Sequence, residues 1–340
     1  MDNVNIVFST DDNYLKYLAV AIQSLVEYAS PENIYSVNIL NCGLRKENKD
    51  KLLLMQKDNI KINFINISSI LQKYESKIFY TRLHFSPAVY YRFFIPEIFC
   101  NLSKIIYCDC DVIFQHDIAE LYNIQLDNKM AGVVKDFVVR AENKEENTKN
   151  FPKGYYTDFL KLKDVNNYFN SGVMLCNIDY MKKINFTEKC IETLENVKIP
   201  RYVDQDILNI VCEDKVLFLD FKWNILNHIF DFHKNILNYL SNQERATYLE
   251  DYKFPYILHF SSNIKPWQEP SIRNSNFFWK YARKTVFYEE IIYSNAFIPN
   301  NEKFKTNFFE TIFSIKNFNK HKIITILGIR IKLNRGIRNV

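Results

Sequence analysis

The sequence predicts an α/β fold in which helices flank a mostly parallel central sheet, and two observations support this prediction. Short apolar, β-branched runs alternate along the chain with segments whose apolar residues recur at helical spacing. The 340 residues include 28 Phe and 22 Tyr but 6 Gly, a composition typical of an ordered globular chain that can bury a large core.

The predicted elements follow one another in the order that such a sheet requires. A strand at 4–9 leads through a polar turn into a helix, and a strand at 34–40, a helix at 47–57 and a strand at 61–67 follow. Further strands are predicted at 104–108, 131–134, 171–177, 215–219 and 256–259. Ligands gather at the carboxyl ends of such strands, so polar residues directly after them are the candidates for function. The polar segment 143–163 is predicted to form a mobile excursion or lid over that edge.

Charge and cysteine usage limit the class of protein. The net charge of +5 is modest, but residues 300–340 hold nine Lys or Arg against two Glu, so the basic excess lies in the tail. The 7 cysteines are scattered, which predicts reduced thiols and a cytosolic protein. The first residues show no basic leader, and no window reaches the apolar length of a spanning helix, so we expect neither a signal peptide nor a membrane span.

Two carboxylates at the end of a predicted strand are the strongest local signal. Asp109 and Asp111 follow the apolar run 105–108 at i and i+2, and both can face one metal if the backbone turns between them. Such hard oxygen ligands suit Mg²⁺ or Mn²⁺, which keep other coordination positions for phosphate oxygens. The plainer alternative for an isolated pair of this kind is an acidic loop.

Polar groups at both ends of the predicted domain suit a nucleotide. After the first strand, Ser9, Asp11 and Asn13 can hydrogen-bond a uracil and a ribose, and Tyr14 can stack on the base. After the last strand, His259 is a possible metal ligand. Six residues later the ammonium of Lys265 can meet a phosphate. A structural role is the alternative for each group taken alone.

Two further motifs lie between these ends. Asn170 and Gly172 stand at the entrance of a predicted strand, where a glycine permits close backbone approach to a ligand; a simple turn is the alternative. Asp204 and Gln205 stand at the start of a predicted helix, where Asp204 alternatively serves only as an N-cap.

In their order and spacing these motifs resemble the retaining glycosyltransferases of family 8, especially the bacterial hexosyltransferases that extend lipopolysaccharide or lipooligosaccharide. The resemblance runs from about Val4 to Trp267 and includes the segment 80–93, in which Arg92 stands 17 residues before Asp109 as in the bacterial relatives. It implies a GT-A type nucleotide-sugar-binding domain at 1–282, followed by a helical, basic and aromatic tail at 283–340.

The resemblance implies three sets of site residues. Mn²⁺ or Mg²⁺ would be held by Asp109, Asp111 and His259. The nucleotide would be bound by Ser9, Asp11, Asn13 and Tyr14. Its diphosphate would be bound by Lys265 and Ser262. The sugar would lie against Arg92, Asp136, Asn170, Asp204 and Gln205. The relatives usually carry a glycine three residues after the metal histidine, so a phosphate contact at Ser262 requires backbone dihedrals that suit serine.

The implied activity is transfer of a hexose, galactose or glucose, from a UDP-sugar to a hydroxyl of a cell-surface glycan such as lipopolysaccharide or a lipid-linked oligosaccharide. An amide is a poor nucleophile, so Gln205 favours attack on the same face over a covalent intermediate. The alternatives are a protein- or glycogen-priming glucosyltransferase and a noncatalytic sugar-nucleotide binding protein.

The tail suggests a membrane surface as a partner. Between 304 and 316, Phe and Ile residues interleave with Lys close to helical spacing, which predicts a basic amphipathic helix on an anionic membrane. The run 323–332 resembles a terminal hairpin or apolar plug of bacterial surface-glycan transferases. A helix packed on the core is the alternative. We therefore expect a cytoplasmic protein peripheral to the inner face of a bacterial cytoplasmic membrane, and no nucleic-acid binding because no such module is present.

Overall fold

The computed structural model describes residues 3–74, 87–145, 154–229, 236–296, 313–318, 321–326 and 329–334. It divides into two compact units, Met1–Ile291 and Ile292–Val340. Phe287 and Ile291 belong to the hydrophobic core of the first unit, beyond the boundary expected after residue 282. Residues 80–86 of the motif before Arg92, and residues 146–153 of the expected lid, lie outside the described residues.

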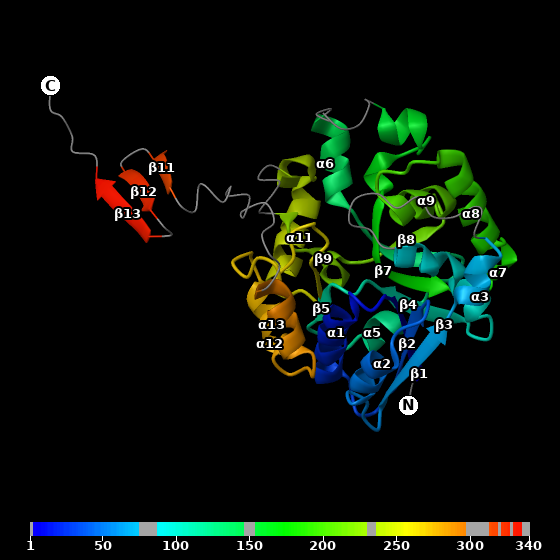
Figure 1. The fold of residues 1–340 in the computed structure, drawn as a ribbon. Helices are drawn as coiled ribbons and strands as arrows, with labels where there is room; N and C mark the ends of the chain where they lie inside the picture. Colours follow the sequence, from blue (N-terminus) through cyan, green and yellow to red (C-terminus); the bar gives the residue numbers. More distant parts are fainter. Residues whose placement is uncertain are drawn as a thin grey trace. The chain divides into compact units, whose positions relative to one another are not determined.

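A seven-stranded sheet forms the centre of the first unit, with the strand order β3-β2-β1-β4-β7-β6-β8 (Figure 1). Its strands are β1 (Asn3–Ser9), β2 (Ile34–Asn41), β3 (Ile60–Asn66), β4 (Lys104–Cys108), β6 (Ala131–Lys135), β7 (Phe169–Asn177) and β8 (Val216–Phe218). All neighbours are parallel except β7, which runs antiparallel to both β4 and β6. The predicted fold class is confirmed. Because β7 is reversed, its first residues lie at the same edge as the last residues of β4 and β6.

Alternation along the strands builds a core layer on each face of the sheet. In β1, Val4, Ile6 and Phe8 join one core cluster while Val7 joins the other, as expected of a strand buried on both faces. The first layer includes α1 (Leu15–Tyr28) and α12 (Ser275–Ala282), which pack against each other. The second layer includes the 3₁₀ helix η1 (Pro87–Phe94), α8 (Phe186–Val197) and α9 (Val203–Val211).

Further helices pack around these elements in the first unit. They are α2 (Lys46–Leu53), α3 (Ser68–Gln72), α4 (Ile95–Ile98), α5 (Ala119–Tyr122), α6 (Phe137–Glu145), α7 (Ile178–Lys183) and α11 (Asn242–Lys253). The helix predicted at 47–57 ends early, at Leu53, because the chain turns there into the strand β3. Among the described residues, no helix is both long and apolar enough to cross a membrane.

A second, small sheet carries the strand predicted at 256–259. It has the order β5-β10-β9, with β5 (Val112–Phe114), β10 (Ile257–His259) and β9 (Ile225–Leu226). The predicted strand is therefore not part of the central sheet. In the antiparallel pair of β10 and β5, His259 lies opposite Val112, which brings the histidine beside Asp111.

The second unit includes the parts of the tail for which the sequence predicts a helix and a hairpin. After α13 (Tyr288–Ala296), which begins in the first unit, the described residues form an antiparallel sheet of β11 (Phe313–Phe318), β12 (His321–Ile326) and β13 (Ile329–Asn334). Of the hairpin or apolar plug predicted over 323–332, the described residues form the antiparallel pairing of a hairpin. The helix predicted to reach residue 316 is wrong at 313–316, because these residues form a strand that hydrogen-bonds to β12. The rest of the predicted helix, 304–312, lies outside the described residues.

Candidate active site

Three strand ends bring the predicted metal ligands together. Asp109 follows β4, Asp111 precedes β5 and His259 ends β10. One ligand atom of each lies within 4.8 Å of those of the other two. The Nε2 atom of His259 is 3.3 Å from Asp111 Oδ1 and 3.7 Å from Asp109 Oδ2. We call these three residues the cation cluster.

The groups of the cation cluster fit a divalent metal ion. Two carboxylates and an imidazole offer oxygen and nitrogen ligands, which suit Mn²⁺ or Mg²⁺. Gly172 on β7 makes room for them, since a Cβ atom there would overlap the His259 ring and lie 2.8 Å from Asp109 Oδ2. The glycine identified in the sequence therefore permits close approach of protein groups, not only of a ligand.

Charged partners hold the two carboxylates in place. Asp109 Oδ1 accepts hydrogen bonds from Arg92 at 2.7 Å and from the Tyr107 hydroxyl at 2.9 Å. The ammonium of Lys265 lies 2.5 Å from Asp111 Oδ2. Burial of Asp111 acts against ionisation, yet Lys265 and His259 outweigh it and hold the pKa of that carboxyl below its ordinary value. Asp111 is thus prepared as an anionic ligand.

A network of buried amides lies beside the cation cluster. Asp136 Oδ2 accepts hydrogen bonds from Asn170 Nδ2 and from Gln205 Nε2, each at 3.3 Å. Gln205 Oε1 in turn accepts the Ser171 backbone N–H at 3.1 Å. Asp136 Oδ1 accepts the Val138 N–H at 3.0 Å at the start of α6. The structure therefore brings together three residues predicted for the sugar, from β6, β7 and α9.

Asn224 links this network to the cation cluster and was missed by sequence reasoning. Its Oδ1 lies 2.9 Å from His259 Nδ1, and its Nδ2 donates to Asn170 Oδ1 at 2.9 Å. The only local signal was a polar residue at the end of the short segment 221–224, before an apolar strand. We call Asp136, Asn170, Gln205 and Asn224 the amide network.

Arg92 connects Asp109 with Asp204. Its Nε atom lies 3.1 Å from Asp204 Oδ2, and its Nη1 atom donates to the Ser171 carbonyl at 2.8 Å. Burial raises the pKa of Asp204 to about 7, although the charge of Arg92 acts in the opposite direction. Arg92 is 5% exposed, so its contacts are with the residues that it positions.

The start of α9 presents Asp204 and Gln205 through an unusual backbone. The helix is capped by Tyr202 without a side-chain hydrogen bond, so the alternative that Asp204 is merely an N-cap is wrong. Val203 has φ of +36°, a strained value for a β-branched residue. Asp206 holds this turn, because its carboxylate accepts hydrogen bonds from the Tyr202 N–H and from the hydroxyls of Tyr155 and Tyr168.

The residues predicted for the nucleotide base follow β1. Ser9 is buried, and within the described part of the chain its hydroxyl has no hydrogen-bond partner, so it can serve a ligand. Asp11 Oδ1 accepts the N–H groups of Asn13 and Tyr14, each at 3.0 Å. Asn13 itself is exposed. The Cys110 thiol donates to the Ser9 carbonyl at 3.1 Å, which joins this loop to the one between the aspartates.

The segment after β10 carries the residues that are predicted to bind the diphosphate. The Lys265 ammonium donates to the Phe260 carbonyl at 2.7 Å as well as to Asp111. The φ angle of Ser262 does not fall in the left-handed region, so serine replaces the relatives' glycine there without strain. Its hydroxyl donates to the Ile264 carbonyl at 2.8 Å.

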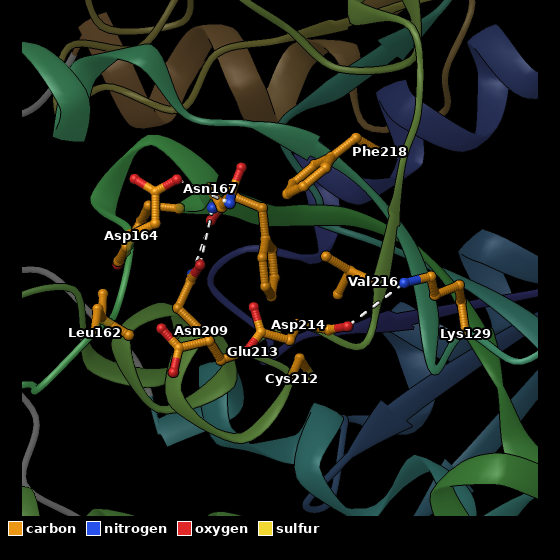
Figure 2. Close-up of a pocket in the computed structure, with 12 residues that line it drawn as sticks. Lys129, Leu162, Asp164, Asn167, Asn209, Cys212, Glu213, Asp214, Val216 and Phe218 are labelled. Carbon is orange, nitrogen blue, oxygen red and sulfur yellow. Dashed lines mark hydrogen bonds between the residues drawn. The ribbon is translucent and has the colours of Figure 1, made fainter.

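A hollow of about 270 Å³ opens beside β8 and the end of α9 (Figure 2). Its lining includes Asp164, Asn167, Glu213 and Phe218, and none of the predicted site residues. Within the described residues the candidate site is therefore marked by its buried polar contacts and not by this hollow.

Comparisons with known proteins identify the family. The model of the glycosyl transferase family 8 matches residues 5–271. General stress protein A of Bacillus subtilis is 27% identical over 270 residues, which cover 78% of this chain and 87% of that protein. Lipopolysaccharide 1,2-glucosyltransferase of Escherichia coli is 23% identical over 294 residues, which cover 82% of this chain and 77% of that protein.

A solved structure extends the likeness to the fold. The apo structure of the bifunctional glycosyltransferase WbbM superposes with a TM-score of 0.74 at 25% identity, covering 86% of this chain and 51% of that one. This chain thus spans most of the two relatives but about half of WbbM. The predicted GT-A type fold is confirmed, and the chain belongs to glycosyltransferase family 8.

Proposed function

We propose that this chain is a metal-dependent, retaining hexosyltransferase that transfers galactose or glucose from a UDP-sugar to a hydroxyl of a cell-surface glycan such as lipopolysaccharide. The observation that carries the proposal is the cation cluster joined by hydrogen bonds to Gln205 through Asn224, Asn170 and Asp136. The likeness to a lipopolysaccharide glucosyltransferase supports the acceptor class.

The proposed reaction breaks the bond between the anomeric carbon and the diphosphate oxygen and forms a bond to the acceptor oxygen. The acceptor's proton passes to the departing diphosphate, so no protein base is required. A cation on Asp109, Asp111 and His259 would supply charge stabilisation for that leaving group. Lys265, which is already beside Asp111, would add a second positive charge. Gln205 and Asp136 orient the sugar for attack on the same face.

A donor screen tests the proposal directly. Purified protein with Mn²⁺ should release UDP from either UDP-glucose or UDP-galactose, faster with a lipopolysaccharide-type oligosaccharide acceptor, and EDTA should stop the release. An increase of one hexose in the mass of the protein itself would instead favour a priming enzyme. Binding of UDP-sugar without turnover, with any donor, would favour the noncatalytic alternative.

We also propose that the tail binds an anionic membrane surface from the cytoplasmic side. The nine basic residues at 300–340 support this, at roughly 1 kcal/mol for each Lys or Arg close to such a surface. Deletion after Pro299 should leave UDP-sugar hydrolysis within about twofold but impair transfer to a lipid-linked acceptor in vesicles. Binding of the full chain to vesicles with phosphatidylserine should fall steeply with salt. Salt-independent binding, or none, would contradict the proposal.

A further inference from the structure

Asn224 is a buried asparagine that touches both halves of the site. It is 2% exposed and lies between the 3₁₀ turn η4 (Phe221–Trp223) and β9. Its two side-chain atoms meet His259 and Asn170, residues that are 35 and 54 positions away in the sequence. Both contacts are 2.9 Å long and buried.

The orientation of both amides follows from one backbone group. The N–H of Gly172 donates to Asn170 at 3.0 Å, and a backbone N–H can only donate, so the Asn170 atom at this position is its oxygen. That oxygen also faces Asn224 at 2.9 Å, so Asn224 must present its nitrogen there. The other Asn224 atom, which faces His259, is consequently the oxygen.

This orientation determines the protonation pattern of His259. An amide oxygen only accepts, so Nδ1 of His259 must carry a hydrogen to make the 2.9 Å contact. In the neutral ring the lone pair then lies on Nε2, the atom that faces the carboxylates of Asp109 and Asp111. A metal ligand needs such an unprotonated nitrogen, and outer partners of this kind set the tautomer in metal sites.

The same asparagine holds the other end of the amide network. With its oxygen fixed by Gly172 and Asn224, Asn170 directs its nitrogen toward Asp136 at 3.3 Å. Asp136 Oδ2 also accepts from Gln205 at 3.3 Å. The hydrogen bonds therefore run without interruption from the imidazole of the cation cluster to the amide beside the proposed sugar position.

We propose that Asn224 is a positioning residue with two separable roles: it fixes the His259 tautomer for the cation, and it holds Asn170, and through it Asp136 and Gln205, for the sugar. The identities of the cation and of the sugar rest on the proposed function. The tautomer role does not, because it concerns contacts within the protein alone.

The tautomer is measured in the full chain without metal by ¹⁵N NMR of histidine. Wild type should show a hydrogen on Nδ1 of His259, and Asn224→Ala should lose this signature. Mn²⁺ binding, followed by electron paramagnetic resonance, should weaken about 10- to 100-fold in Asn224→Ala. Asn227→Ala is the matched control, because Asn227 is equally buried but its side chain bonds Arg273 and Asn274 instead.

Asn224→Asp separates the two roles. Its carboxylate still accepts the Nδ1 hydrogen but cannot donate to Asn170, so the tautomer and Mn²⁺ affinity should stay within about threefold of wild type while kcat falls about tenfold. Unchanged tautomer and Mn²⁺ affinity in Asn224→Ala would overturn the tautomer role. Unchanged kcat in Asn224→Asp would overturn the sugar-side role.

The test distinguishes this proposal from the proposed function. If wild type binds no Mn²⁺, the metal assignment of the cation cluster fails, but the ¹⁵N signature still decides whether Asn224 fixes the tautomer. If wild type binds Mn²⁺ and both Asn224 variants lose the signature equally while Asn227→Ala keeps it, the acceptor argument for Asn224 is wrong and the metal assignment stands.

Discussion

The cation cluster and the amide network lie side by side but are built from opposite kinds of groups. The cation cluster gathers ionisable side chains, and the Asp109 carboxylate at its mouth is 27% exposed. The amide network surrounds a single buried carboxylate, Asp136, with neutral amides whose hydrogen bonds are made within the protein. Charge should therefore decide the behaviour of the first region, and geometry that of the second.

The largest expected effect comes from removing charge at the cation cluster. Asp111→Asn keeps the volume but removes an anionic ligand, so metal-dependent turnover should fall about 1,000-fold or more while the fold survives. Chelation of wild type should reproduce the loss. A kcat equal to that of wild type at limiting Mn²⁺ would show that charge at Asp111 is not what the site requires.

A change of geometry in the amide network should lower kcat and leave UDP binding nearly unchanged. Gln205→Ala should lower kcat about 100-fold, because Gln205 bonds Asp136 and the Ser171 backbone beside the position proposed for the sugar. The Kd for UDP, measured by calorimetry, should change less than about threefold. Equal losses in kcat and in UDP affinity would remove Gln205 from the sugar side.

Gly172 lies where the two regions meet, so its substitution sharpens the comparison. Gly172→Ala places a Cβ atom on the His259 ring and should weaken Mn²⁺ binding about tenfold, with a stability cost of about 1–3 kcal/mol from overpacking. Gly132→Ala is the control, because the atoms nearest to its Cβ would belong to leucine side chains. It should cost stability and leave Mn²⁺ affinity unchanged. Similar Mn²⁺ affinities in the two variants would argue against the steric role of Gly172.

The smallest expected effect is a pH dependence of stability at Asp204. Burial raises its pKa to about 7, whereas an unfolded aspartate titrates near pH 4. Between these values the folded state keeps a proton that the unfolded state has lost, so stability falls as pH rises, by up to about 1.4 kcal/mol per pH unit. In urea unfolding without metal, the free energy of unfolding of Asp204→Asn should increase relative to that of wild type as pH rises through this window. A difference that does not vary with pH would contradict the assignment.

The sequence predicted best those site residues that directly follow apolar strands. Asp109 and Asp111 were found because strand-final carboxylates at i and i+2 are a local pattern. Asn224 could not be found, since its role depends on contacts across 35 and 54 residues. The prediction of a helix reaching residue 316 is wrong at the start of β11, because a short run of Phe, Ile and Lys fits both periods. Only the pairing of β11 with β12 decides between them.

The direction of β7 could not be predicted from a local sequence pattern either. Its apolar run reads the same in either direction, and the antiparallel pairing with β4 and β6 is set by the path of the chain between residues 136 and 168. Asn170 is nevertheless a predicted site residue, because it stands beside a glycine at a strand entrance. Its role toward the sugar comes from the family resemblance.

The reversal of β7 also places both ends of the segment between β6 and β7 at one edge of the sheet. Lys135 ends β6 there, and Phe169 begins β7 opposite it. Within the segment, Asp136 belongs to the amide network, and Tyr155 and Tyr168 donate hydrogen bonds to Asp206. A substitution in this segment can therefore disturb the position of Gln205 without changing any residue of α9 itself.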